Sequence, residues 1–285
     1  MKDLISLMRI PHYIKNMLIF LPLFFSGSFR NKELIVVNII GFLSFCLLTS
    51  AVYIFNDICD KEKDKMHSVK KERPIASGKI SARKAYIYAI ILLALSASLL
   101  ICGNLNNTYA IGLMGLYAIL NIAYSLKLKN IPIIDVAIIT TGLVIRLIYG
   151  GVISGIIISN WLYLTVMAIS FYMGYGKRRN EILMQKNETR EVLKHYTCNF
   201  LDKNMYISAA LAIIFYSLWA IDISTKHTVN LVYSVPLVII IIMKYSLDIE
   251  GESNGDPVEV LLSDKWLVAL SIIYGLLLTF AIYFS

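Results

Sequence analysis

Charged residues are scarce in this sequence of 285 residues, at 16%, whereas hydrophobic residues make up 58%. Soluble globular domains contain roughly 25% charged and about 45–50% apolar residues, so the composition excludes an ordinary soluble globule. The stretches 34–56, 85–126 and 266–285 contain no charged residue at all. Each is long enough to cross the hydrocarbon of a membrane, which takes ~20 residues, and the longest can cross twice. The composition therefore predicts an integral membrane protein.

Cysteine and histidine are also rare, with four of each. The cysteines form no CxxC pair, so neither a disulfide framework nor a zinc site is expected. The histidines are scattered over separate loops, which argues against a histidine metal site. No small-residue cleavage site follows the first apolar run, so a cleavable signal peptide is not expected either.

Apolar stretches that are separated by polar residues predict an all-α membrane bundle with a single domain over residues 1–285. The nine expected spans lie near 14–29, 34–56, 85–102, 108–126, 133–153, 161–176, 205–222, 229–247 and 266–284. The first span is the least regular because Pro22 interrupts a short apolar core, a pattern compatible with a kinked helix that follows an interfacial segment.

The distribution of Lys and Arg predicts the orientation. With the N-terminus in the cytoplasm, the outside connections contain only Arg30, Lys32 and Lys226 of the 27 Lys and Arg residues. This asymmetry predicts that the C-terminus lies outside the cytoplasm. The membrane is expected to be the cell's inner (cytoplasmic) membrane. The formal charge of +8 therefore reflects topology first and anionic partners second. Nucleic acid is not an expected partner.

Carboxylates gather at the inner end of the second span, in the sequence Asn56-Asp57-x-x-Asp60-x-x-x-Asp64. If the helix continues, these four side chains lie within an arc of about 100° and extend over about 12 Å along the helix axis. Like charges so close repel each other unless a cation lies between them, and Mg²⁺ prefers carboxylates, water and substrate phosphates. The alternative is a solvated helix end in which the interleaved lysines pair with the acids.

Two further polar segments on the inside predict phosphate binding. Arg73, in the loop after the acids, offers a planar fork of donors. The stretch from Lys177 and Arg178 to Arg190 is basic with interspersed acids, which suits phosphate better than metal. In both cases the charges could instead serve only to set the topology. The acidic segment 248–264 has no assigned role.

Arg146 lies within the fifth span, roughly 16 Å deeper than Asp135 on the same helix face. A charge at such depth is costly and normally points into a cavity or at a partner, so Arg146 is a candidate site residue. Pairing with another buried polar group, without a role in binding, is the alternative.

The acidic motif, Arg73-Pro74 and Tyr124-Ser125-x-x-Leu128-Lys129 together resemble the UbiA superfamily of intramembrane prenyltransferases. Those enzymes are nine-helix bundles in which magnesium, held by two aspartate-rich motifs, binds a prenyl diphosphate. The first motif is present here. At the expected place of the second, after the sixth span, this chain has Lys177-Arg178-Arg179-Asn180-Glu181.

That departure resembles one branch of the superfamily, the decaprenyl-phosphate phosphoribosyltransferases, also called 5-phosphoribosyl-phosphoryl-polyprenol synthases. The segments that carry this likeness are Arg9-x-Pro11-His12-Tyr13-x-Lys15-Asn16, Phe20-x-Pro22-Leu23-Phe24-Phe25, Tyr124–Val136, Gly142-x-Val144-x-Arg146 and Lys177-Arg178-x-x-Glu181. The resemblance implies that a polyprenyl phosphate oxygen attacks the anomeric carbon of phosphoribosyl diphosphate and releases diphosphate. The product would be a precursor in cell-wall biosynthesis.

The residue patterns and the resemblance together define a candidate site. Asp57, Asp60 and Asp64 are expected to bind Mg²⁺ and, with Lys177 and Arg178, to be catalytic. The expected substrate-binding residues are Lys15, Asn56, Arg73, Tyr124, Lys127, Asp135, Arg146, Glu181, Arg190 and Tyr196. Because the lipid phosphate is already a nucleophile, no dedicated base is expected.

Two other functions remain open at this point. A conventional prenyltransferase would move a prenyl group from a diphosphate to an aromatic or other small acceptor, and would consume no pentose phosphate. A transporter or lipid flippase would explain the spans and Arg146, but it gives no reason for three acids on one face at the inner membrane edge.

Overall fold

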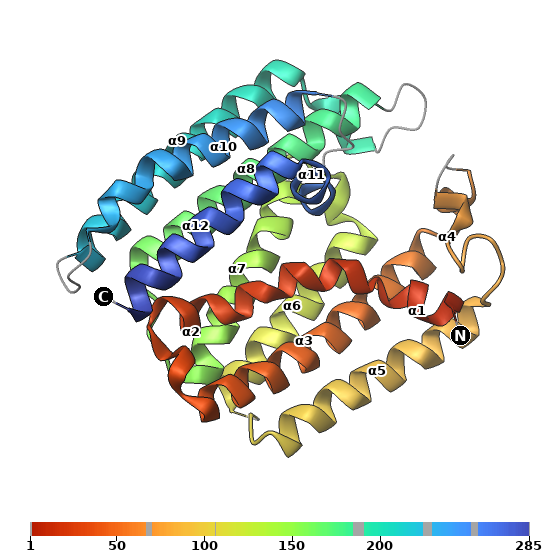
Figure 1. Cartoon of the computed structure of the whole chain (residues 1–285). Coiled ribbons are helices and arrows are strands. Elements are labelled where there is room, and N and C mark those ends of the chain that lie inside the picture. Colours follow the sequence, from red (N-terminus) through yellow and green to blue (C-terminus); the bar gives the residue numbers. More distant parts are fainter. Residues whose placement is uncertain are drawn as a thin grey trace. The chain divides into compact units, whose positions relative to one another are not determined.

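The computed structural model describes residues 2–66, 70–105, 107–184, 191–224, 230–251 and 256–284, and within these ranges all regular structure is helical (Figure 1). This confirms the expected all-α fold class. Seven helical segments in these ranges are long and apolar enough to cross a membrane. They are α3 (Lys32–Cys59), α5 (Ala82–Cys102), α6 (Thr108–Leu126), α7 (Ile134–Ser154), α9 (Cys198–Ser224), η6 with α10 (Leu231–Ser234 and Val235–Glu250) and α12 (Lys265–Tyr283).

The other two expected spans are helical but do not meet that criterion. The first is divided into a 3₁₀ helix, η1 (Ile10–Phe20), and the short helix α2 (Leu21–Phe25). Pro22 opens α2, in agreement with the expected interruption. The sixth is α8 (Asn160–Met184), which is longer than expected. Its tyrosines, glycines and charged last turns lower its hydropathy below that of the seven apolar segments.

Shorter helices connect these elements or cap their ends. They are α1 (Lys2–Met8), η2 (Ser28–Arg30), α4 (Lys61–Lys65), η3 (Lys70–Glu72), η4 (Leu128–Asn130), η5 (Glu191–His195) and α11 (Pro257–Ser263). Side-chain oxygens cap several long helices by accepting backbone N–H bonds, which the first turn of a helix otherwise lacks. The caps of α3, α5, α6 and α12 are Asn31, Ser81, Asn107 and Asp264.

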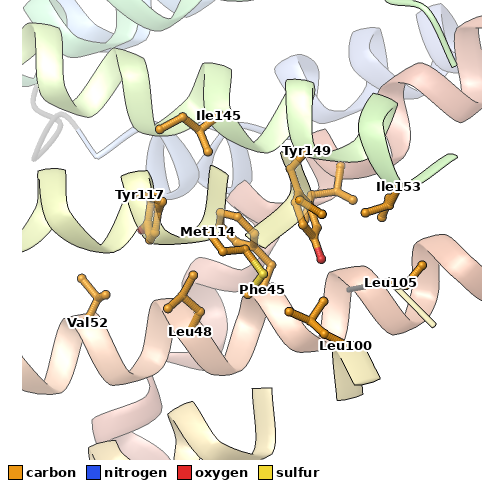
Figure 2. Close-up of a cluster of buried hydrophobic side chains, with 12 residues drawn as sticks. Phe45, Leu48, Val52, Leu100, Leu105, Met114, Tyr117, Ile145, Tyr149 and Ile153 are labelled. Carbon is orange, nitrogen blue, oxygen red and sulfur yellow. The ribbon is translucent and has the colours of Figure 1, made fainter. Parts of the chain in front are cut away.

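The chain forms two compact units. The first comprises Met1–Ile138 and Ile145–Ile157, and the second comprises Ile139–Val144 and Ile158–Ser285. In the first unit, α3, α6 and α7 share an aromatic core (Figure 2). The ring of Phe45 lies 5.0 Å from that of Tyr117 and 5.2 Å from that of Tyr149. This core packs together the three helices whose ends carry the candidate residues Asn56, Asp57, Tyr124 and Asp135.

A second core in the first unit joins α1, α3 and α5 to the turn that follows Arg73. Ile75 in that turn is fully buried and packs with Leu7 and Ile54. Small residues allow α3 and α5 to approach closely. Ser44 Oγ donates to the Ser96 carbonyl at 2.9 Å, and Ser96 Oγ donates to the Ser44 carbonyl at 2.8 Å. The loop that carries Arg73 is therefore anchored by burial.

Close backbone contact fixes η1 against α7. A Cβ at Gly150 would lie 2.0 Å from the Ile19 carbonyl oxygen, so only glycine fits at this position. The contact sets the position of η1, which carries Asn16, one turn before Ile19. In the second unit, α8, α9, α10 and α12 pack side by side (Figure 1).

Candidate active site

The acidic motif lies at the junction of α3 and α4 in the first unit. The sequence predicts one continuous helix here, but α3 ends at Cys59 and α4 begins at Lys61, with Asp60 between them. Backbone N–H groups still donate from Asp60 to Asn56 at 2.9 Å and from Asp64 to Asp60 at 2.8 Å. Because these i to i−4 bonds persist, the helical spacing of the acids is retained across the break.

Arg73 connects two of these acids. Its Nη1 donates to Asp57 Oδ1 at 3.0 Å and to Asp64 Oδ2 at 2.7 Å. Both carboxylates are buried, with exposed fractions of 3% for Asp57 and 5% for Asp64. A second guanidinium, from Arg9, donates to the same Asp57 oxygen and lies over the Tyr53 ring at 5.1 Å. The sequence interpretation assigned no role to Arg9.

The remaining members of the motif contact the last turn of α6 and the short helix η4. Lys129 Nζ donates to Asp60 Oδ1, and Ser125 Oγ donates to the Asn56 side-chain oxygen at 2.9 Å. The interleaved Lys65 pairs instead with Glu62, which is outside the motif, at 2.9 Å. The motif acids therefore pair with cations from three other segments. We call Asp57, Asp60 and Asp64 with their partners Arg9, Arg73 and Lys129 the acidic cluster.

The donor chemistry of the acidic cluster fits Mg²⁺. Within the described ranges, no group of three or more His, Cys, Asp or Glu side chains converges closely enough to hold a metal without help. Mg²⁺ in phosphate sites does not need such a cage, because it is bound by one or two carboxylates, by water and by the phosphates of the substrate. One nitrogen of Arg73 lies within hydrogen-bond distance of two carboxylates, so Asp57 and Asp64 already face a common point.

Arg146 is buried in the first unit, with an exposed fraction of 4%. Its Nε donates to the Asn16 side-chain oxygen at 2.6 Å, and its Nη2 donates to the Tyr117 hydroxyl at 3.0 Å. The guanidinium carbon also lies 4.8 Å from the Tyr117 ring centre and 5.4 Å from that of Phe45. The expectation that Arg146 points into the protein and meets a polar partner is confirmed. Its contact with substrate remains a prediction.

Four other predicted residues of the first unit are placed but their roles remain predictions. Lys15 and Tyr124 are partly buried and Lys127 is exposed. Asp135 is fully buried in the first turn of α7, where the positive end of the helix dipole favours a carboxylate.

The second unit carries the basic residues on the last turns of α8. Lys177 Nζ donates to Asp256 Oδ2 at 3.1 Å, Arg178 Nη1 to Glu181 Oε2 at 2.6 Å, and Arg179 Nε to Asp202 Oδ1 at 2.6 Å. We call Lys177, Arg178 and Arg179 the basic cluster. The Lys177 side chain is 30% exposed, whereas Arg178 is 1% exposed. Arg178 is therefore held inside the protein by an ion pair, and the role of these cations in phosphate binding stays a prediction.

The acidic segment 248–264 acquires a structural role that sequence reasoning missed. Asp256 holds Lys177, as described, and Asp264 accepts from Lys244 Nζ at 2.7 Å while it caps α12. Tyr196 is buried and its ring stacks on Phe200 at 5.9 Å between centroids. Arg190, a predicted substrate-binding residue, lies outside the described residues.

A sequence profile of the UbiA prenyltransferase family matches residues 18–262. This chain belongs to the UbiA prenyltransferase family. The match confirms the resemblance inferred from the motifs, and the all-helical fold and apolar helices agree with an integral membrane protein of this family.

Curated relatives of this UbiA-family chain include decaprenyl-phosphate phosphoribosyltransferases. The protein from Corynebacterium glutamicum is 32% identical over 98% of this chain and 86% of its own length. The protein from Mycolicibacterium smegmatis is 33% identical, with 99% and 93% covered. A relative of the same name from Mycobacterium tuberculosis is 30% identical over 81% of this chain and 77% of its own length. The expected branch of the family is thereby confirmed.

Solved structures of UbiA-family proteins share the fold. A UbiA homolog from Archaeoglobus fulgidus, bound to GPP and Mg²⁺, superposes with a TM-score of 0.73 over 97% of this chain and 99% of its own, at 21% identity. A structure of the same homolog bound to Cd²⁺ gives a TM-score of 0.68 over 98% of each chain, at 20% identity. At 20–21% identity, the likeness to these structures establishes the fold of this chain.

Proposed function

We propose that this protein transfers the 5-phosphoribosyl group of phosphoribosyl diphosphate to a polyprenyl phosphate and releases diphosphate. The observation that carries the proposal is the similarity to decaprenyl-phosphate phosphoribosyltransferases at 32–33% identity over almost the whole chain. The basic cluster on α8, at the position where the resemblance leads us to expect a second acidic motif, agrees with a reaction that handles more phosphate groups than prenyl transfer does.

In the proposed reaction, Asp57, Asp60 and Asp64 would hold Mg²⁺, and the bound ion would supply positive charge for the diphosphate leaving group. Arg73 bridges two of these acids at 2.7 and 3.0 Å. Arg73 is proposed to bind a phosphate of the substrate, for which its planar fork is well suited. Arg9, which shares Asp57 with Arg73, stands beside it as a second donor.

The basic cluster binds phosphate oxygens of the substrates. Lys177 is the more accessible residue and makes the contact as a compact point charge. Arg178 is held by its ion pair with Glu181 and, although buried, adds to the positive charge of the basic cluster. Because a phosphate monoester is already anionic at neutral pH, catalysis consists of positioning and charge stabilisation, without a general base.

The proposal includes the topology. The seven apolar segments, together with η1–α2 and α8, make nine crossings in one membrane domain of residues 1–285, with the N-terminus in the cytoplasm and the C-terminus outside. The excess of Lys and Arg in the connections expected inside supports this orientation in the cytoplasmic membrane. Labelling of single cysteines at Asn107 and Lys127, in a cysteine-free background, tests it. Only the cysteine at 107 should react with an impermeant reagent added outside intact cells.

A transfer assay tests the function. Purified protein is incubated with radiolabelled phosphoribosyl diphosphate, Mg²⁺ and polyprenyl phosphate, and label is measured in the organic phase. We expect label to enter the lipid, and we expect chelation of the divalent cation to prevent it. A parallel arm supplies a prenyl diphosphate with an aromatic acceptor. Transfer in that arm alone, across several lipid lengths, would reject the phosphoribosyl reaction in favour of a conventional prenyltransferase.

A further inference from the structure

The three cations of the basic cluster differ in where their carboxylate partners lie. The partner of Arg178 is on α8 itself, and the partner of Arg179 is on α9, which packs along α8. Asp256, which pairs with Lys177 at 3.1 Å, belongs to neither helix. It directly precedes the seven-residue helix α11, in the connection from α10 to α12. Lys177 is therefore paired with a carboxylate from outside the long packed helices.

The connection that carries Asp256 is itself anchored in the second unit. Lys244 on α10 donates to Asp264, the cap of α12, at 2.7 Å. Val260 in α11 is 1% exposed, and its backbone N–H donates to the Asp256 carbonyl at 2.9 Å. The position of Asp256 against Lys177 is therefore built into the fold.

The Lys177–Asp256 pair is partly exposed. The two side chains are 30% and 13% exposed, compared with 1% and 12% for Arg178 and Glu181. Water and salt screen an exposed ion pair, so breaking it costs little. A buried guanidinium that loses its partner is far more costly. Lys177 can therefore exchange its carboxylate for another anion at low cost, whereas Arg178 cannot.

An anion that binds Lys177 meets the Asp256 carboxylate at the same ammonium group. The carboxylate oxygen lies 3.1 Å from Lys177 Nζ, and two anions so close to each other repel. A phosphate or diphosphate group carries more negative charge than one carboxylate, so it attracts the lysine more strongly. The carboxylate is therefore the weaker of the two competitors.

We propose that Asp256 is a displaceable counter-ion of Lys177, which competes with a substrate phosphate and thereby sets the affinity of the basic cluster for it. The inference rests on the proposed function, since both proposed substrates carry phosphate. The phosphate belongs either to phosphoribosyl diphosphate or to the lipid headgroup. Asp256 leaves Lys177 when the phosphate binds and returns to it when the phosphate is released.

Two substitutions remove the charge and keep the start of α11. Asp256 stands directly before Pro257, the first residue of α11, and Asp, Asn and Ser are all favoured at the position before a helix. Asp256→Asn and Asp256→Ser should therefore fold, which Tm measurements check. Glu250→Gln removes the same charge at an exposed site in the last turn of α10 and serves as the control.

The test is the affinity of purified full-length protein for inorganic pyrophosphate, measured by titration calorimetry without divalent cations. We expect both Asp256 variants to bind pyrophosphate about fivefold more tightly than the wild type, and Glu250→Gln to bind it as the wild type does. In a Lys177→Ala background, Asp256→Asn should bring a smaller gain, because the counter-ion then has no cation to release. In the transfer assay, the substrate whose KM falls in the Asp256 variants is the one that competes with the carboxylate.

Unchanged pyrophosphate affinity in both Asp256 variants would overturn the inference, as would an equal gain with and without Lys177. Weaker binding would also overturn it, and would mean that Asp256 positions Lys177 for its ligand. These outcomes are distinct from failure of the proposed function, because the titration requires no turnover. If the wild-type protein transfers no phosphoribosyl group, the proposed function is rejected, whereas the titration decides the role of Asp256 as counter-ion.

Discussion

The acidic cluster of the first unit and the basic cluster of the second are both made of ion pairs, but they share their partners differently. In the acidic cluster, Arg73 serves two carboxylates and Asp57 receives two guanidinium groups. In the basic cluster, the structure shows each cation with a different carboxylate. A shared cation leaves two carboxylates facing each other when it moves away.

This difference leads us to expect that the two clusters respond differently to substrate. Two buried carboxylates that lose a bridging cation repel each other, and a divalent ion relieves that repulsion best. The acidic cluster is therefore suited to exchange a guanidinium for a metal ion. The basic cluster is suited to keep its cations in place, because a buried arginine such as Arg178 is costly to expose or to leave unpaired. The following experiments test this contrast.

The largest effect is expected from neutralising the carboxylates of the acidic cluster. Asp57→Asn, Asp60→Asn and Asp64→Asn should each reduce turnover by up to about a hundredfold, because each would remove one charged ligand of the proposed Mg²⁺. The variant with both Asp57→Asn and Asp64→Asn should lose less than the product of the single effects, since the two residues face one point. Turnover is measured against Mg²⁺ concentration. Glu62→Gln, at an exposed pair on α4, serves as the control and should be active. Wild-type rates in two of the three motif variants at limiting Mg²⁺ would refute the metal assignment.

Arg178→Lys tests the ion pairs of the basic cluster. Lysine keeps the charge but not the planar fork, so the bond to Glu181 is weakened and activity should fall about tenfold. Lys177→Ala should lower phosphoribosyl transfer to a similar extent. The measurement is steady-state transfer, with topology checked by labelling of an outside cysteine. If both variants insert correctly and show normal kinetics, the basic cluster has no part in the reaction.

Alanine substitutions at two glycines compare how tightly helices are packed in the two units. Gly150→Ala should destabilise the protein by roughly 1–3 kcal/mol, because the added Cβ meets the Ile19 backbone, which cannot move without shifting η1. Gly176→Ala should cost less, since its Cβ meets the terminal methyl of a flexible Ile249 side chain. The measurement is the free energy of unfolding in detergent. Equal losses would mean that η1 is not held rigidly against α7.

The smallest effect is expected when the pH is lowered and a helix cap loses its charge. The bond from Lys244 and the Leu267 backbone N–H lower the pKa of Asp264 below its ordinary value. The stabilisation from this carboxylate is complete above its unfolded pKa, and it is lost as pH falls through the lower folded pKa, below about pH 4. Asn107, which caps α6 in the first unit, has no such titration. Amide exchange at Leu267, compared with Ala110, should therefore accelerate first on acidification. Parallel acceleration at both sites would contradict the assignment.

Sequence by itself determined the fold class and the position of the acidic motif. Uncharged stretches of membrane-spanning length must be helical, because the hydrocarbon offers no other partner to backbone polar groups. The spacing of Asp57, Asp60 and Asp64 likewise defines one helix face, and it does so even though α3 ends at Cys59. The burial of Arg146 followed from the cost of a charge at that depth.

Only the tertiary structure decided which cations meet those acids. Arg9 and Lys129 are separated from their carboxylates by 48 and 69 positions. Arg9 also adopts a left-handed backbone conformation with φ 51°, which no periodic pattern predicts. The same holds for Asp256, 79 positions from Lys177. Helix periodicity extends over a few turns, whereas contacts between distant segments depend on how buried faces such as those of Ile19 and Gly150 fit together.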